Sequence, residues 1–182
     1  MEASWDYAVV LDFWTFQDCS SQAIGRNFLG TLNKFGFIPK KFGDEDPPTH
    51  KFDRASSERV LKVWSKRPGQ LNFQRLGRLG FQALVHLSGR MPSLITIAVH
   101  DEYFQSEKNI MKFLRFSEEL YTLFRPFHGK ISHYKDWENK TVIITPVKVG
   151  NRIVNAEAHI PVQPANGLPG IFWANYLSPR FV

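Results

Sequence analysis

Phe81-Gln82-Ala83-Leu84-Val85-His86-Leu87 is followed, after a break, by Leu94-Ile95-Thr96-Ile97-Ala98-Val99. In the first segment every second residue from Phe81 to Leu87 is apolar, which is the period of a strand with one buried face. The second segment is rich in β-branched residues and apolar on both faces, as is typical of a central strand covered on both sides. Residues 88–93 contain Gly and Pro and indicate a turn. The sequence therefore predicts that the two segments pair as a β-hairpin.

Two helices and two further strands are predicted outward from this hairpin. Ser106 can cap a helix over Glu107–Arg125, in which apolar residues recur at helical spacing until Pro126 ends it. A second helix begins after Ser20 or Ser21 and ends at Gly36. Strands are expected at residues 7–14 and 128–134. The order strand, helix, strand, strand, helix, strand predicts an α+β fold, a ferredoxin-like βαββαβ antiparallel sheet with the two main helices on one face.

The remaining segments are predicted to be an insertion and an irregular C-terminal β extension. The insertion lies between the first helix and the second strand, and it contains a long surface loop over residues 43–57 and a short helix over 57–66. Residues 70–79 are interpreted as a turn entering a strand. Residues 141–145 predict a strand that Pro146 interrupts, and Gly150-Asn151 predicts a small hairpin. We expect one domain over 1–182, with a core at 1–134 and the extension at 135–182.

Composition limits the class of protein. The 182 residues are 43% hydrophobic and 14% aromatic, which is typical of a globular chain. Cys19 is the one cysteine, so no internal disulfide can form. The first residues lack a basic segment followed by an apolar core, and no apolar run approaches the ~18 residues of a membrane span, so a cytoplasmic location is predicted. The net charge of +6 comes from scattered basic residues, a pattern that favours a solvated basic surface.

The end of the chain carries a resemblance to a known family. It reads Leu168-Pro169-Gly170-Ile171-Phe172-Trp173-Ala174-Asn175-Tyr176-Leu177-Ser178-Pro179-Arg180-Phe181-Val182. This pattern resembles bacterial immunity proteins of polymorphic-toxin and type VI secretion systems, most nearly the immunity protein 52 family. Met91-Pro92-Ser93-Leu94 and Phe127-His128-Gly129-Lys130-Ile131 resemble the same group. Trp173, Asn175 and Tyr176 are taken as a structural motif, because an aromatic-dense stretch usually buries itself.

The resemblance implies a small α+β protein that binds and neutralises a secreted toxin carrying a restriction-endonuclease-like nuclease domain. It implies a stoichiometric inhibitor that acts by occlusion, with no catalysis, no cofactor and no metal. The expected partner is the cognate toxin rather than a membrane or nucleic acid, and the sequence leaves a homodimer open.

The toxin-contacting residues are predicted from local charge. An inhibitor that approaches a basic cleft is expected to be acidic, whereas this chain is basic overall. A local acidic patch would resolve the conflict, as would binding beside the toxin's active site or across a toxin dimer surface. Trp137 has polar neighbours on both sides and is a candidate binding hot spot. The candidate contact residues are Asp44, Glu45, Asp46, Asp101, Glu102, Tyr103, Asp136, Trp137 and Glu138.

Two other classes of function are weighed against this one. An enzyme would need a site built from the six histidines or from Asp101-Glu102, but no HExxH, GxSxG or zinc-spaced Cys and His set occurs. His86 and His100 can face each other across the hairpin, a pair we interpret as structural. A nucleic-acid-binding module is the alternative that the basic charge favours. RNA-recognition domains of this fold expose sheet aromatics, and residues 94–99 contain none.

Overall fold

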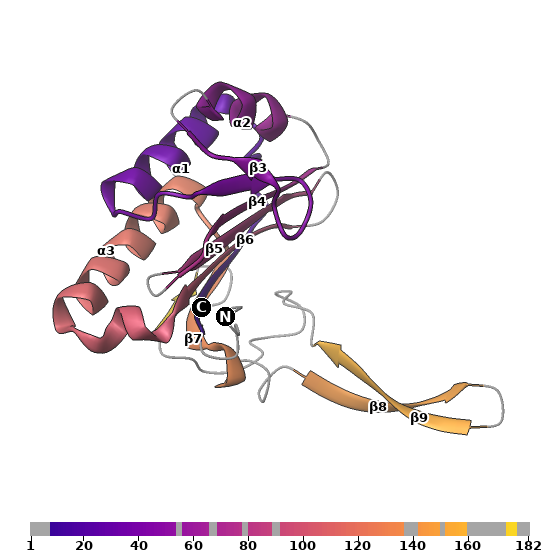
Figure 1. The fold of residues 1–182 in the computed structure, drawn as a ribbon. Coiled ribbons are helices and arrows are strands. Elements are labelled where there is room, and N and C mark those ends of the chain that lie inside the picture. The colour runs from indigo at the N-terminus through magenta and orange to yellow at the C-terminus, as the bar shows by residue number, and fades with distance from the viewer. Residues whose placement is uncertain are drawn as a thin grey trace.

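The structure is a computed structural model that describes residues 8–53, 56–65, 69–77, 80–88, 92–136, 142–149, 152–159 and 174–177. Figure 1 shows the arrangement of its elements. In chain order they are β1 (Ala8–Thr15), α1 (Gln22–Lys34), β2 (Lys41–Gly43), β3 (His50–Lys51), α2 (Ser56–Trp64), β4 (Gly69–Arg75), β5 (Phe81–Leu87), β6 (Ser93–His100), the 3-10 helix η2 (Asp101–Gln105), α3 (Glu107–Phe124), β7 (His128–His133), β8 (Val142–Val149), β9 (Arg152–His159) and β10 (Ala174–Leu177).

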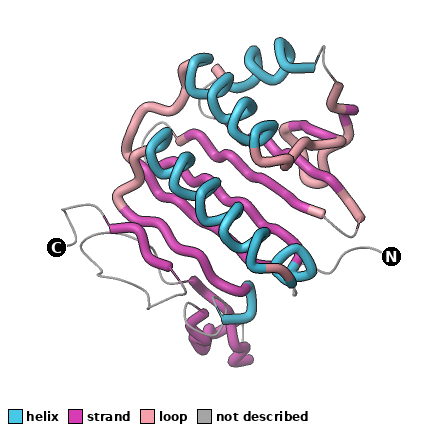
Figure 2. The backbone as a smooth tube through the Cα atoms, turned by 90° about the vertical axis from the view of Figure 1, so that its left-hand side faces the viewer, coloured by secondary structure: helices cyan, strands magenta, loops and turns pink. Residues whose placement is uncertain are grey.

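The fold is mixed α+β, built on one large antiparallel sheet. In the described part of the chain this sheet has eight strands in the order β10-β7-β1-β6-β5-β4-β2-β3. The three α-helices cover one of its faces (Figure 2). The predicted strands are confirmed as β1, β5, β6 and β7, and they lie together in the order β7-β1-β6-β5. The predicted hairpin is the pair β5 and β6.

The sheet extends beyond the four predicted strands on both sides. Residues 70–79 were expected to form a turn entering a strand, but most of them form the strand β4, which pairs with β5 along its whole length. Only Leu71 and Phe73 of β4 are large apolar residues, and Gln and Asn flank them, so the glycines that follow gave the stronger local signal. The insertion supplies β2 and β3, and β10 joins the other edge.

Caps explain why the two long helices begin and end where predicted. The Ser21 hydroxyl accepts a hydrogen bond from the Ile24 N–H at 3.3 Å, and Ser106 does the same for Asn109. Gly36, with φ of 74°, follows α1. At the end of α3 the Thr15 hydroxyl of β1 donates to the Phe124 carbonyl at 2.8 Å, satisfying a helix-end acceptor inside the protein.

The core lies between the sheet and the helices and is dominated by aromatic rings. Phe37 contacts four other rings, those of Phe81, Tyr103, Phe113 and Phe116, at centroid distances of 4.7–6.2 Å. The short helix predicted after residue 57 is confirmed as α2, and it inserts Trp64 fully into this core. The Trp64 indole N–H donates to the Cys19 carbonyl at 2.7 Å, so its one polar atom is satisfied.

The predicted C-terminal hairpin is longer than expected. β8 and β9 pair from Val142 with His159 to Val149 with Arg152, and the pairing continues through Pro146. Their two-stranded sheet is separate from the large one and extends away from it in Figure 1. Among the helices in the described ranges, none has the length and apolarity needed to cross a bilayer.

Candidate functional site

The acidic loop after β2 is held against the sheet. The Glu45 carboxylate accepts hydrogen bonds from the backbone N–H and the hydroxyl of Thr49, and these bonds lower its pKa to about 2. The Glu45 carbonyl accepts from the Asn72 side chain at 3.0 Å, and Asp46 accepts from the Gln82 side chain at 3.2 Å. Asn72 and Gln82 alternate with core residues of β4 and β5, so the loop lies on the face opposite the helices.

The second predicted contact segment follows β6 as η2. His100 Nδ1 lies 3.1 Å from Asp101 Oδ1, and 43% of the Asp101 side chain is exposed. Tyr103 is different, because it is only 7% exposed and packs against Phe37 and Phe104. Its burial raises its pKa. Tyr103 therefore anchors η2 to the core, whereas Asp101 reaches the surface.

The structure brings three of the predicted acidic positions to one end of the sheet. The loop residue Asp46 bonds to Gln82, two residues from Gly80, whose carbonyl accepts from the His100 N–H at 3.2 Å. The next residue is Asp101. The ends of β6 and β7 both lie beside the start of β1. Asp136 comes three residues after the end of β7, so it lies at the same end of the sheet as Asp101. Trp137 and Glu138 lie outside the described residues.

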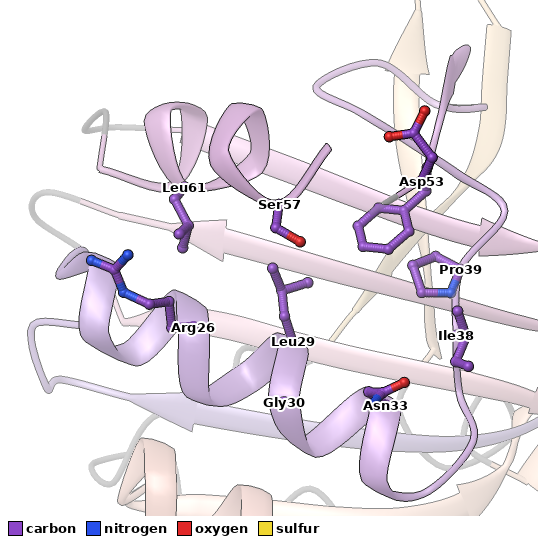
Figure 3. A pocket seen from close by; sticks show the side chains of 10 residues that line it. Arg26, Leu29, Gly30, Asn33, Ile38, Pro39, Asp53, Ser57 and Leu61 are labelled. Carbon is purple, nitrogen blue, oxygen red and sulfur yellow. The ribbon is translucent and has the colours of Figure 1, made fainter. Parts of the chain in front are cut away.

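A half-open cleft of about 560 Å³ lies between α1 and α2 (Figure 3). Leu29 points from α1 toward α2, while Ser57 and Leu61 point back from α2. Arg26 lies at one end of the cleft, and Asp53 and Ile38 lie at the other. An apolar floor with a polar rim suits an apolar group that has polar edges. Sequence reasoning missed this cleft, because it depends on where α2 packs.

Two glycines of α1 explain the shape of the cleft. A Cβ at Gly25 would lie 2.9 Å from the Trp64 ring and 3.0 Å from Leu61, so the helices meet closely there only because Gly25 has no side chain. A Cβ at Gly30 would meet nothing within 4 Å. The two helices therefore touch at Gly25, and the cleft, which Gly30 helps to line, opens beside that contact.

A polar row, buried at Asp12 and Lys130, crosses four strands on the face opposite the helices. The register pairs Asn175 with Lys130, Lys130 with Asp12, and Asp12 with Thr96. Lys130 Nζ lies 3.3 Å from Asp12 Oδ2, and the Thr96 hydroxyl donates to Asp12 Oδ1 at 2.6 Å. Burial lowers the pKa of Lys130, and the Asp12 charge opposes that shift. If β1 slipped by one residue against its neighbours, the Asp12 side chain would face the aromatic core. The polar row therefore fixes the register of the strands.

The neighbouring row stacks His128 on Trp14, with ring centroids 5.2 Å apart. Burial, together with the Lys130 charge, lowers the pKa of His128 to about 4, so its ring is neutral at pH 7. Sequence reasoning used His128 and Lys130 only as part of the family resemblance and passed over Asp12. Asp12 could have been noticed from the sequence, because it is a charged residue between the apolar residues Leu11 and Phe13 of a predicted strand.

Tyr176 of the predicted structural motif is partly buried and packs against the core. Its ring contacts Phe13 and Tyr121 at 5.3 and 5.4 Å, and its hydroxyl lies 2.6 Å from the Ser117 hydroxyl of α3. Asn175 occupies the polar row on the opposite face. Trp173 lies outside the described residues.

The histidine pair that the sequence suggested across the hairpin, interpreted there as structural, does not form. His86 pairs with Leu94 near the turn, while His100 is at the far end of β6, six residues or about 20 Å along the strand. Burial raises the pKa of Cys19 to about 11, so its thiol stays protonated at neutral pH. In the described part of the chain, no group of three or more His, Cys, Asp or Glu side chains is placed to hold a metal ion.

No protein-family model matches the chain, and a search of curated proteins finds no match. Among solved structures, the chain is similar to the T6SS protein PA0821 of Pseudomonas aeruginosa, with a TM-score of 0.48 and 12% sequence identity. The likeness covers 69% of this chain and 41% of that one, so this chain spans less than half the length of the protein it matches. Membership of the immunity protein 52 family stays a prediction.

Proposed function

We propose that this chain is an immunity protein that binds a cognate secreted toxin, a nuclease effector of a type VI secretion system, and neutralises it by occlusion without catalysis. One observation carries the proposal. The three sequence pieces that resemble immunity proteins, although far apart in the chain, contribute strands to the same sheet. Residues 128–131 of β7 pair with all of β10, and Ser93-Leu94 begin β6, two strands away across β1.

This assembly supports a shared fold rather than three separate matches. Gly129 is opposite both Phe13 of β1 and Tyr176 of β10, so the glycine of one piece lies beside the tyrosine of another. The order β7-β1-β6-β5, with α1 and α3 as crossovers on one face, also supports the ferredoxin-like arrangement for the core.

The contact surface we propose is the acidic end of the sheet, formed by Asp44, Asp46, Asp101, Glu102 and Asp136. Hydrogen bonds from Thr49 keep the neighbouring Glu45 ionised, since its pKa lies near 2. A net charge of +6 does not oppose this surface. At physiological salt, exposed charges are screened beyond about 8 Å, so the local carboxylates set the potential that an approaching basic toxin meets.

Co-purification with the product of the adjacent gene, followed by a DNA-cleavage assay, tests the proposal. We expect a one-to-one complex in which cleavage stops, with more than 1,000 Å² of total surface buried, as is typical of stable complexes. A product that still cleaves DNA in the presence of excess chain would overturn it. Affinity of the chain for DNA or RNA that falls steeply with salt would instead support the nucleic-acid-binding alternative. For that alternative, the residues of β6 that face away from the helices, Leu94, Thr96 and Ala98, offer no aromatic ring on which a base could stack.

A further inference from the structure

An apolar pocket of about 220 Å³ lies at the sheet edge, between α3 and the strands β7 and β10. Seven side chains line it, and all are apolar. Those used below are Ile110, Leu114, Ile131 and Ala174. A site without polar groups cannot hold ordered water well, and a dry cavity of ~150 Å³ is known to accept benzene. This pocket therefore has room for one large apolar side chain.

The pocket opens to the surface at α3, because Ile110 both lines it and is 41% exposed. Met111 is 46% exposed but does not line the pocket, since it lies about 100° further round the helix. Two lining residues come from the pieces that resemble immunity proteins, Ile131 from β7 and Ala174 from β10. The small side chain of Ala174 leaves part of the space open.

Two carboxylates of α3 follow the helical spacing of the pocket residues. Glu107 precedes Ile110 by three residues and Glu118 follows Leu114 by four, so both lie on the same side of α3 as the pocket residues. Burial raises the pKa of Tyr176, and the hydrogen bond with Ser117 opposes that rise. The negative charge of Glu118 also raises the pKa of Tyr176, because Glu118 lies near this residue of β10. Neither carboxylate is ion-paired with another described residue. An apolar pocket with Glu107 and Glu118 on the same side of α3 is complementary to an apolar side chain on a basic surface.

We propose that this pocket is an anchor site for the toxin, which inserts one large apolar side chain from a basic surface. The assignment rests on the proposed function. The charge argument selects the partner, because a protein that acts on nucleic acid needs basic residues around its cleft to meet the phosphates. A central aromatic or aliphatic anchor in a desolvated pocket is also the usual form of an interface hot spot.

The test fills the pocket without creating a cavity. Ala174→Leu places extra methyl groups in the open space, so the variant should melt at the same temperature as the wild type or higher. Burial of one large side chain is worth about 10- to 150-fold in affinity. We therefore expect Ala174→Leu to weaken binding of the purified product of the adjacent gene at least 10-fold. Ile110→Ser, which removes part of one wall, should also weaken it, whereas Met111→Ser is the matched control and should change binding less than 2-fold.

A second measurement uses indole and the chain alone. Indole should shift the Ile110 and Ile131 methyl signals of the wild type saturably in NMR, and Ala174→Leu should abolish the shifts. Absence of shifts in the wild type would overturn the pocket as a binding site. Unchanged toxin affinity in Ala174→Leu would overturn the anchor and leave the immunity role standing. A wild type that does not bind the toxin would overturn both. A wild-type dimer that Ala174→Leu converts to monomer would assign the pocket to a second copy and overturn the toxin anchor.

Discussion

Replacement of Gly129 by alanine should be one of the most destabilising small changes in the sheet. Gly129 lies in β7, and a Cβ there would be 2.2 Å from Phe13 Cδ1 and 2.4 Å from Cε1. No real contact is that short, so the Phe13 ring would have to move. It is fully buried, and edge contacts with Tyr121 and Tyr176 at 6.2 and 5.3 Å hold it on the other sides.

The magnitude follows from the cost of overpacking a core. Extra methyl groups forced into a packed interior cost about 1–3 kcal/mol. The clash at Gly129 involves a ring held between two other rings, so we expect a loss near the upper limit, about 3 kcal/mol. Gly30→Ala is the matched control, since its Cβ would meet nothing within 4 Å in the middle of α1. That change should stabilise the protein by about 1 kcal/mol through helix propensity.

A double-mutant cycle with Phe13→Leu tests the cause. Removal of the ring opens the space that the alanine methyl needs, so the double variant should be more stable than the sum of the two single effects predicts, by about 1–2 kcal/mol. Urea unfolding followed by tryptophan fluorescence gives each free energy of unfolding. Effects that add within about 0.5 kcal/mol would refute the argument that the Gly129–Phe13 contact sets the cost.

Three further predictions concern charges. Lys130→Met leaves the Asp12 carboxylate buried without its cation and should cost about 3–5 kcal/mol, much of which Asp12→Asn in the same chain should restore, as urea unfolding would measure. The free energy of unfolding should fall by about 3 kcal/mol as the pH is lowered from about 6.5 to about 4, because His128 binds a proton in this range in the unfolded chain but stays neutral when it is buried. A His128→Gln variant should show a flatter dependence of stability on pH. Asp44→Lys with Asp46→Lys should slow association with a basic toxin about 10-fold at low salt, whereas Glu58→Lys on α2 should have little effect; equal rates in stopped-flow mixing would contradict the acidic surface.

Local signals were enough for most of the core elements. β5 and β1 show alternation or apolar runs, and α1 and α3 combine helical spacing with Ser caps and clear stops. β10 was not predicted as a sheet strand because its place is set by distant partners. The four residues of β10 join the edge of the sheet beside β7 because Tyr176 contacts Phe13 across Gly129. This contact joins segments that are far apart in the chain.

The candidate site could be predicted in part. The acidic loop was expected at the surface, and its hydrogen bonds to Asn72 and Gln82 could not be foreseen without the register of β4 and β5. Tyr103 was grouped with Asp101 by its position in the sequence, yet the aromatic core retains its ring. The α1–α2 cleft and the pocket at Ala174 are properties of packing between elements, and no local pattern encodes them.

The central position of β1 has a kinetic consequence. Its two neighbours, β6 and β7, are both made much later in synthesis, and the side-chain contacts it makes join residues 84 apart at Asp12–Thr96 and 109 apart at Thr15–Phe124. Sheets that depend on such distant pairings fold slowly, because the entropy of closing long loops is lost before the contacts form. During translation, an apolar β1 strand must therefore wait unpaired while about 80 more residues emerge. For this chain, the interval in which a chaperone is most needed is set by the strand order of the sheet.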